Sequence, residues 1–117
     1  RSGVSVKLSA LHPAYRAVKS ARVHRELYPM LRELALKAAE ANIHLTLDAE
    51  EADRLILSLE LLQRLAEEPE LSGWMGLGFA LQAYQKRADL VAAWLVSLAQ
   101  RTGRRLMVRL VKGAYWD

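Results

Sequence analysis

The chain has 117 residues, of which 52% are hydrophobic and 26% are charged, as in an ordinary soluble globular protein. Because it contains no cysteine, disulfides and thiolate zinc sites are excluded within it, and we expect a reducing cytoplasm as its location. It also lacks the ~20-residue apolar run that spans a bilayer. The net charge of +4 would suit nucleic-acid binding, but most basic residues are dispersed, and we interpret the cluster Arg101, Arg104 and Arg105 as a solvated surface.

The first predicted element is a strand at residues 4–9, in which apolar and polar side chains alternate and Lys7 lies on the polar face. A helix follows, because apolar residues recur at helical spacing up to Asn42, a residue that tolerates the left-handed conformation of a helix terminus. Pro29 interrupts this stretch. A proline inside a helix costs about 3 kcal/mol, so the helix either begins near Pro29 or is kinked there. The apolar stripe consists of Val23, Leu27, Leu31, Leu34, Ala35 and Ala38.

The second strand is predicted at residues 43–48, with Asp48 as the last residue of its polar face. The helix after it carries carboxylates within residues 50–53, where they meet the positive end of the helix dipole. We interpret the acidic sequence at residues 67–70 as a solvated helix end and loop. The apolar stripe of this helix consists of Leu55, Ile56, Leu59, Leu62, Leu65 and Ala66.

The third strand is predicted at residues 77–84, with Gln82 on its polar face. The third helix ends at Thr102 and Gly103, where the glycine is typical of a helix cap. The stripe of this helix, in which we interpret Trp94 as a core residue, consists of Leu90, Val91, Trp94, Leu95 and Leu98.

The last predicted strand, residues 106–111, has an arginine, Arg109, in its interior. An arginine in such a place needs a partner or a ligand. The strand continues directly into residues 112–117, whose sequence is KGAYWD. Its glycine allows a close approach to the backbone, its aromatic rings could stack on a flat ring, and its charges could hold an anion. This pattern indicates a binding site at the carboxyl end of the strand.

Four strands alternating with three helices predict a parallel sheet covered by helices, either an open doubly wound sheet or a closed eight-stranded barrel. Strands of an open sheet are apolar on both faces, whereas each strand here has one polar face. No Gly-x-Gly-x-x-Gly turn follows the first strand, so the best sign of an open dinucleotide-binding sheet is missing. We therefore expect an α/β fold, a partial (β/α)8 barrel, whose lumen receives Lys7, Asp48, Gln82 and Arg109.

The length of the chain is about half of what such a barrel needs, since a complete one has roughly 250 residues. We expect residues 1–117 to be a fragment of one catalytic barrel domain, with the remaining strands elsewhere. Edge strands left open by a partial barrel can pair with other chains, so we expect the isolated polypeptide to self-associate.

Metal binding is not expected. His12, His24 and His44 lie far apart, and none has the four-residue helical spacing of zinc enzymes. We interpret them as structural histidines, although His12 could line the mouth of a site.

Four blocks of sequence carry a specific resemblance: residues 6–13 (VKLSALHP), 46–51 (TLDAEE), 82–87 (QAYQKR) and 109–117 (RLVKGAYWD). In order and spacing they closely resemble the proline dehydrogenase domain of the bacterial bifunctional proline-utilisation flavoenzymes, a variant (β/α)8 barrel that carries FAD. The resemblance implies oxidation of L-proline to 1-pyrroline-5-carboxylate by hydride transfer to flavin N5, with electrons passed to a membrane quinone. It also implies an aldehyde dehydrogenase module in the parent chain and peripheral contact with the inner membrane.

The resemblance further implies roles for single residues. Lys7 would hold the substrate carboxylate, and Asp48 would orient charged groups of the site. Ala114 and Tyr115 would shape the pocket over the flavin. The residues implied to contact FAD are Gln82, Arg109, Val111, Gly113 and Trp116. In the family, an arginine pair that clamps the proline carboxylate comes from later in the barrel, so we expect the 117 residues alone to lack turnover.

Two other functions remain open from the residues themselves. A lysine at a barrel strand end suits a Schiff-base aldolase, with Lys7 as nucleophile and Asp48 as proton shuttle. A basic module that binds nucleic acid or an acidic membrane without catalysis would show a steep salt dependence. We expect no contact with nucleic acid through this segment.

Overall fold

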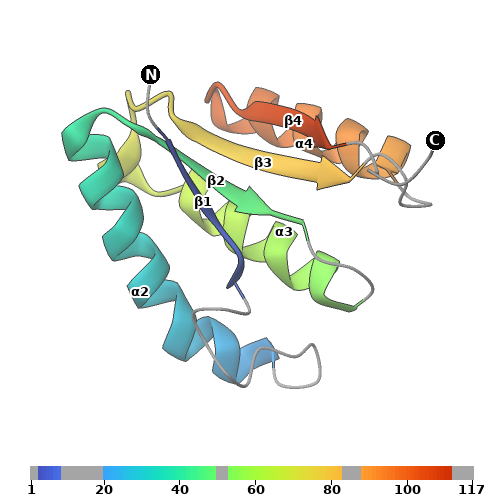
Figure 1. The fold of residues 1–117 in the computed structure, drawn as a ribbon, viewed down its shortest axis with the longest axis horizontal. Helices are drawn as coiled ribbons and strands as arrows, with labels where there is room; N and C mark the ends of the chain where they lie inside the picture. The colour runs from blue at the N-terminus through green and yellow to red at the C-terminus, as the bar shows by residue number, and fades with distance from the viewer. Residues whose placement is uncertain (1–2, 9–19, 50–52, 83–87, 112–117) are drawn as a thin grey trace.

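The computed structural model describes residues 3–8, 20–49, 53–82 and 88–111, and its strands form one parallel sheet. The order of the strands in the sheet is their order in the chain (Figure 1). The α-helices α2, α3 and α4 connect successive strands, and a short 3-10 helix, η2, follows α3. The elements are β1 (Gly3–Val6), α2 (Ser20–Ala41), β2 (His44–Asp48), α3 (Asp53–Ala66), η2 (Pro69–Leu71), β3 (Leu77–Gln82), α4 (Ala88–Thr102) and β4 (Met107–Val111). The predicted alternation of strands and helices is confirmed.

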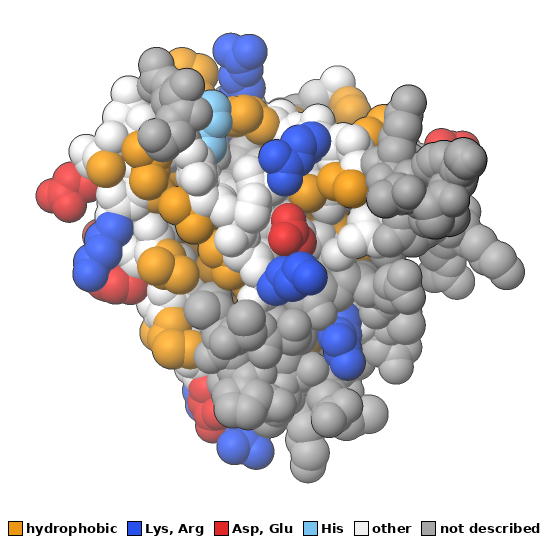
Figure 2. All heavy atoms as spheres, in the orientation of Figure 1, with side chains coloured by type: hydrophobic (Ala, Val, Ile, Leu, Met, Phe, Trp, Pro, Cys, Tyr) orange, Lys and Arg blue, Asp and Glu red, His pale blue; other side chains and the backbone are white. Residues whose placement is uncertain are grey.

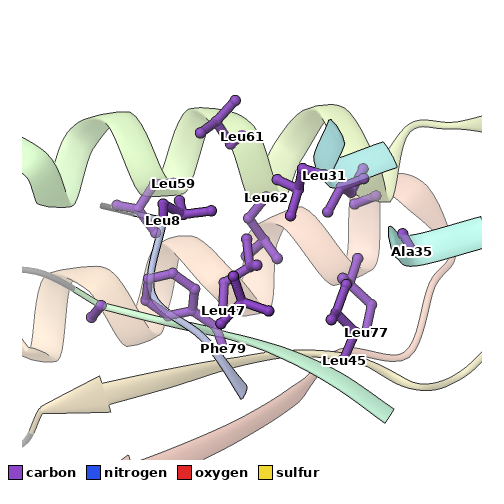
Figure 3. Close-up of a cluster of buried hydrophobic side chains, with 14 of the residues drawn as sticks. Leu8, Leu31, Ala35, Leu45, Leu47, Leu59, Leu61, Leu62, Leu77 and Phe79 are labelled. Carbon is purple, nitrogen blue, oxygen red and sulfur yellow. The ribbon is translucent and has the colours of Figure 1, made fainter. Parts of the chain in front are cut away.

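The helices cover one face of the sheet. α3 and α4 lie behind the strands in Figure 1, and α2 packs beside α3. Buried side chains of all three helices form a single core with the apolar face of the strands, as Figure 3 shows around Phe79 and Leu47. A parallel sheet with helices on a single face is what a barrel wall requires, whereas an open doubly wound sheet has helices on both faces.

The strand register assigns each residue to a face. Val6, Leu47, Phe79 and Val108 are partners across the four strands. The first three are buried in the core with the helices, whereas Val108 is 43% exposed. Since successive residues of a strand point to opposite faces, the next row faces away from the helices. That row contains Asp48, Ala80 and Arg109.

Two helix ends have the predicted geometry. Asn42 has a φ of 56° and Gly103 a φ of 65°, so both residues adopt the left-handed conformation that ends a helix. Pro29 lies inside α2, which begins at Ser20, so a helix start near the proline is wrong. Burial of Tyr28 and Leu31 on either side of the exposed proline stabilises the helix through this position.

Some predicted core residues are exposed. Leu34, Ile56 and Leu90 belong to the predicted stripes but lie at the surface, so these three predictions are wrong. In α3 the buried face instead includes Leu57 and Leu61, because this helix packs against α2, α4 and the sheet at once. Each helix buries the side that its neighbours cover. Periodicity alone therefore misassigns residues at the edges of the buried face.

Two surface interpretations also need correction. Glu68, in the acidic sequence after α3, accepts a hydrogen bond from the Tyr28 hydroxyl at 2.8 Å and pairs with Arg32 Nε at 3.2 Å. Arg32 also pairs with Glu70. Arg104 is not solvated but partly buried, and it donates hydrogen bonds to main-chain carbonyls. The acidic segment and this arginine therefore hold elements together.

Candidate functional site

The candidate site is centred on one row of the sheet. Asp48 is the register partner of Ala80, and Ala80 is the register partner of Arg109. Neighbouring strands lie about 4.8 Å apart, so the Cα atoms of Asp48 and Arg109 are separated by about 10 Å. Ala80 contributes only a methyl group between the carboxylate and the guanidinium, and it is itself buried.

Two more predicted site residues lie near this row. Gln82, at the end of β3, is the partner of Val111, and its Nε2 donates a hydrogen bond of 3.5 Å to the carbonyl of Ala49. Lys7 directly follows the last residue of β1 and is exposed. The register brings Asp48, Gln82 and Arg109 to one face of the sheet. The predicted strand at residues 4–9 ends at Val6, so Lys7 lies just beyond it, and the role of these four residues in a site stays a prediction.

The row below the site contains Thr46, Gly78 and Met107. Gly78 has no room for a side chain, because a Cβ there would lie 2.6 Å from the main-chain oxygen of Met107. The middle strand therefore presents only a glycine and an alanine before Gln82. Both Gly78 and Ala80 are buried, so the middle strand contributes little surface of its own between the longer side chains of β2 and β4.

The charges of this face are mixed. Figure 2 views the molecule from this side and shows an acidic side chain between two basic ones over the central strands. Within the described part of the chain, Asp48 and Arg109 make no ion pair and no side-chain hydrogen bond, in contrast to Arg32 and Arg104. A carboxylate and a guanidinium on the same face can bind groups of opposite charge on one ligand.

The remaining predicted residues fall into two sets. His24 lies in α2, where its Nε2 is 3.0 Å from Glu60 Oε1 and its Nδ1 is 3.1 Å from Arg64 Nη1, and His44 begins β2. Among the described residues no group of three metal-binding side chains lies together, and no helix is long and apolar enough to cross a bilayer. The predicted residues that lie outside the described ranges are His12, Gly113, Ala114, Tyr115 and Trp116.

The sequence analysis gave no role to Ala80, which lies two residues before Gln82 on the same face of the predicted strand. The signal that could have identified it is the occurrence of two small residues, Gly78 and Ala80, at alternate positions of a strand whose neighbours carry charged side chains. That signal has meaning only when the register is known, because the register sets which neighbours flank the alanine.

Comparison with known proteins identifies the family. A family model described as proline dehydrogenase matches residues 1–117. The chain belongs to the proline dehydrogenase family. It is 61% identical over 115 residues to the bifunctional protein PutA of Salmonella typhimurium and 58% identical to that of Escherichia coli K12. Each alignment covers 98% of this chain and 9% of the relative.

Solved structures agree with this assignment to the proline dehydrogenase family. The chain superimposes on PutA of Bradyrhizobium japonicum with a TM-score of 0.92 and 55% identity, covering 100% of this chain and 12% of that one. With PutA of Bdellovibrio bacteriovorus, inactivated by N-propargylglycine, the TM-score is 0.87, the identity 33%, and the coverage 97% and 12%. The chain thus spans about a tenth of the length of these relatives, and its sheet is consistent with part of their barrel. Membership in this family does not favour a Schiff-base aldolase or a basic binding module.

Proposed function

We propose that this chain supplies part of the active site of an FAD-dependent enzyme that oxidises L-proline to 1-pyrroline-5-carboxylate. The observation that carries the proposal is the row Asp48, Ala80 and Arg109 on the face of the sheet opposite the described helices, in a chain that matches the proline dehydrogenase family throughout. We further propose that residues 1–117 are a fragment of one catalytic (β/α)8-barrel domain, completed by the rest of a longer protein.

The residues of this face fit a flavin. A flavin needs hydrogen-bond donors at its polar edge and a flat, weakly polar surface beneath its rings. Arg109 and Gln82 supply donors, and Gly78 and Ala80 add no bulky side chain to this face of the middle strand. When bound, FAD supplies the chemistry of accepting hydride at N5 and passing electrons to a quinone.

The side chains of the site have distinct tasks in this proposal. The guanidinium of Arg109 stabilises negative charge that develops on the bound cofactor. Lys7 binds the carboxylate of proline, and Asp48, of opposite charge, orients the charged groups around it. Gln82 and Val111 contact the cofactor from adjacent strands. The residues outside the described ranges, Gly113, Ala114, Tyr115 and Trp116, keep the roles that the family resemblance implies.

The longer protein is proposed to act with several partners. The bifunctional PutA relatives support a second catalytic module, which we propose to be an aldehyde dehydrogenase. A quinone acceptor requires access to a membrane, so we propose a cytoplasmic protein with peripheral contact to the inner membrane.

The absorption spectrum of the full-length parent protein tests the function. We expect a flavin band that bleaches when L-proline is added without oxygen, because the substrate reduces the cofactor. Lys7→Met should raise the proline concentration needed for bleaching, whereas Lys37→Met, at an exposed position of α2, should not. A protein without a flavin band, or a band that proline leaves unchanged, would contradict the proposal.

A further inference from the structure

Arg104 lies in the turn between α4 and β4, and its guanidinium binds three main-chain carbonyls. Nε donates to Ala66 at 3.0 Å, and Nη1 donates to Leu71 at 2.9 Å and to Trp74 at 3.1 Å. Ala66 and Leu71 end α3 and η2, whose last carbonyls have no partner within the helix. Burial lowers the pKa of Arg104, but a guanidinium stays charged in proteins. One side chain therefore ties the start of β4 to the segment that leads into β3.

Trp74 continues this connection toward β2. Its indole Nε1 donates a hydrogen bond of 3.1 Å to the carbonyl of Ile43, directly before β2. Gly76 makes the contact possible, because a Cβ there would lie 2.6 Å from Trp74 Nε1 and 2.8 Å from the Ile43 oxygen. The carbonyl of Gly76 also accepts a hydrogen bond of 2.8 Å from the amide of Leu45. We call Ile43, Trp74, Gly76 and Arg104 the register clamp.

The register clamp lies at the opposite end of the strands that carry the site. Ile43, Trp74 and Arg104 each precede a member of the row, Asp48, Ala80 and Arg109 respectively, by five or six residues. At 3.3 Å per residue five or six residues span at most ~16–20 Å. A shift of one residue in the register of a strand would turn Arg109 to the helix face.

β4 depends on the register clamp more than the other strands do. All five of its residues are exposed, and among the described strands only β3 pairs with it. Within these 117 residues little apolar packing holds β4 in place, in contrast to β3, where five of six residues are buried. Its pairing with β3 and the polar contacts of Arg104 at its start fix its position in this part of the sheet.

We propose that the register clamp positions the row of the active site and that Arg104 is a positioning residue for Arg109. The proposal rests on the proposed function, since a misplaced Arg109 would lower the affinity for flavin and the rate of proline oxidation. A displacement of 1 Å can cost about 10²-fold in rate. A lysine cannot replace Arg104, because an ammonium does not offer the planar fork that reaches three carbonyls.

The test uses the full-length protein at temperatures well below its melting point. Arg104→Met and Arg104→Lys should each lower the flavin affinity and kcat/KM for proline about tenfold. This loss is smaller than the ~10²-fold that a 1 Å displacement of Arg109 can cost. Arg101→Met and Arg105→Met are matched controls, because both side chains are exposed, and they should leave both quantities unchanged. Trp74→Phe keeps an aromatic side chain but removes the indole N–H together with the five-membered ring, and it gives a second reading if Arg104→Met does not fold.

Two readouts separate positioning from stability. Arg104 and Trp74 variants that melt earlier but, once folded, bind flavin and turn over proline like the wild type would overturn the proposal. Hydrogen exchange of the Met107–Val111 amides needs neither flavin nor proline, and it should be faster in Arg104→Met than in Arg105→Met. If the wild type binds no flavin, the proposed function fails, and equal exchange in the two variants would then overturn the register clamp as well.

Discussion

Asp48 and Arg109 lie on the same face of the sheet and are separated only by Ala80. A negative and a positive side chain thus lie two strands apart toward the carboxyl ends of parallel strands, where barrel enzymes bind their substrates. In the proposed function the two charges have different tasks, since Arg109 serves the cofactor and Asp48 orients the charged groups around the substrate. A nucleic-acid surface would instead need basic side chains alone.

Replacing Arg109 in the full-length protein should impair the reduction step. We expect Arg109→Met to lower the rate of flavin reduction by proline about 10²-fold, the usual loss when a donor to developing negative charge is removed. Arg109→Lys should lower this rate less, because lysine keeps the positive charge although it lacks the planar N–H donors of the guanidinium. Rapid-mixing absorbance measurements give the rate, and Arg105→Met serves as the control. A rate in Arg109→Met equal to that of the wild type would exclude Arg109 from the site.

Gly78 should not tolerate even a methyl group. In Gly78→Ala the new Cβ would lie 2.6 Å from the Met107 oxygen, so β3 and β4 would have to separate. Such overpacking typically costs about 1–3 kcal/mol, and we expect a lower melting temperature of the full-length protein. Gly103→Asn is the control, because no atom lies within 4 Å of a Cβ there and asparagine tolerates its φ of 65°. Equal melting temperatures of the two variants would show that the contact is not tight.

The order of the elements follows from sequence because it depends on local patterns. Two-residue and 3.6-residue periods distinguish strands from helices, and Asn42 and Gly103 mark helix ends through their own backbone preferences. The polar face of each strand is also local information. For this reason Asp48, Gln82 and Arg109 could be assigned to a common face before any register was known.

The rest depends on neighbours that are distant in sequence. Leu90 has the spacing of a core residue, yet no described element covers it. Arg104 has the surroundings of a surface residue, but its three acceptors lie 30 to 38 residues earlier in the chain. The role of Ala80 depends on its register partners. Periodicity gives no information about such contacts.

Tyr28 should make stability depend on alkaline pH. Its hydroxyl donates to Glu68 at 2.8 Å, and burial, followed by that carboxylate, raises its pKa above the ordinary value of about 10. A raised pKa in the folded state means that this stabilisation is complete below pH ~10 and declines as the pH rises further, because only the unfolded chain ionises freely. Tyr28→Phe should therefore lose about 1–2 kcal/mol at pH 7 and show a weaker decline above pH ~10.

Thermal melting of the full-length protein at pH 7 and pH 10.5 measures this effect. Arg22→Gln removes an exposed ion pair with Glu26 and should change the melting temperature little at either pH. An alkaline decline in Tyr28→Phe as steep as in the wild type would assign the pH dependence to other groups.

The outer edge of β4 should make the isolated 117-residue polypeptide self-associate. No described strand pairs with this edge, and Val108 and Leu110 are 43% and 60% exposed. Unpaired backbone groups beside apolar side chains are a template for pairing with another chain. We expect sedimentation velocity to show oligomers at micromolar concentration, and Leu110→Lys to shift them toward monomer. Ile56→Lys, at a position 53% exposed on α3, removes a similar apolar surface away from the edge and should not. A monodisperse wild-type monomer that melts cooperatively would show that the edge is not adhesive.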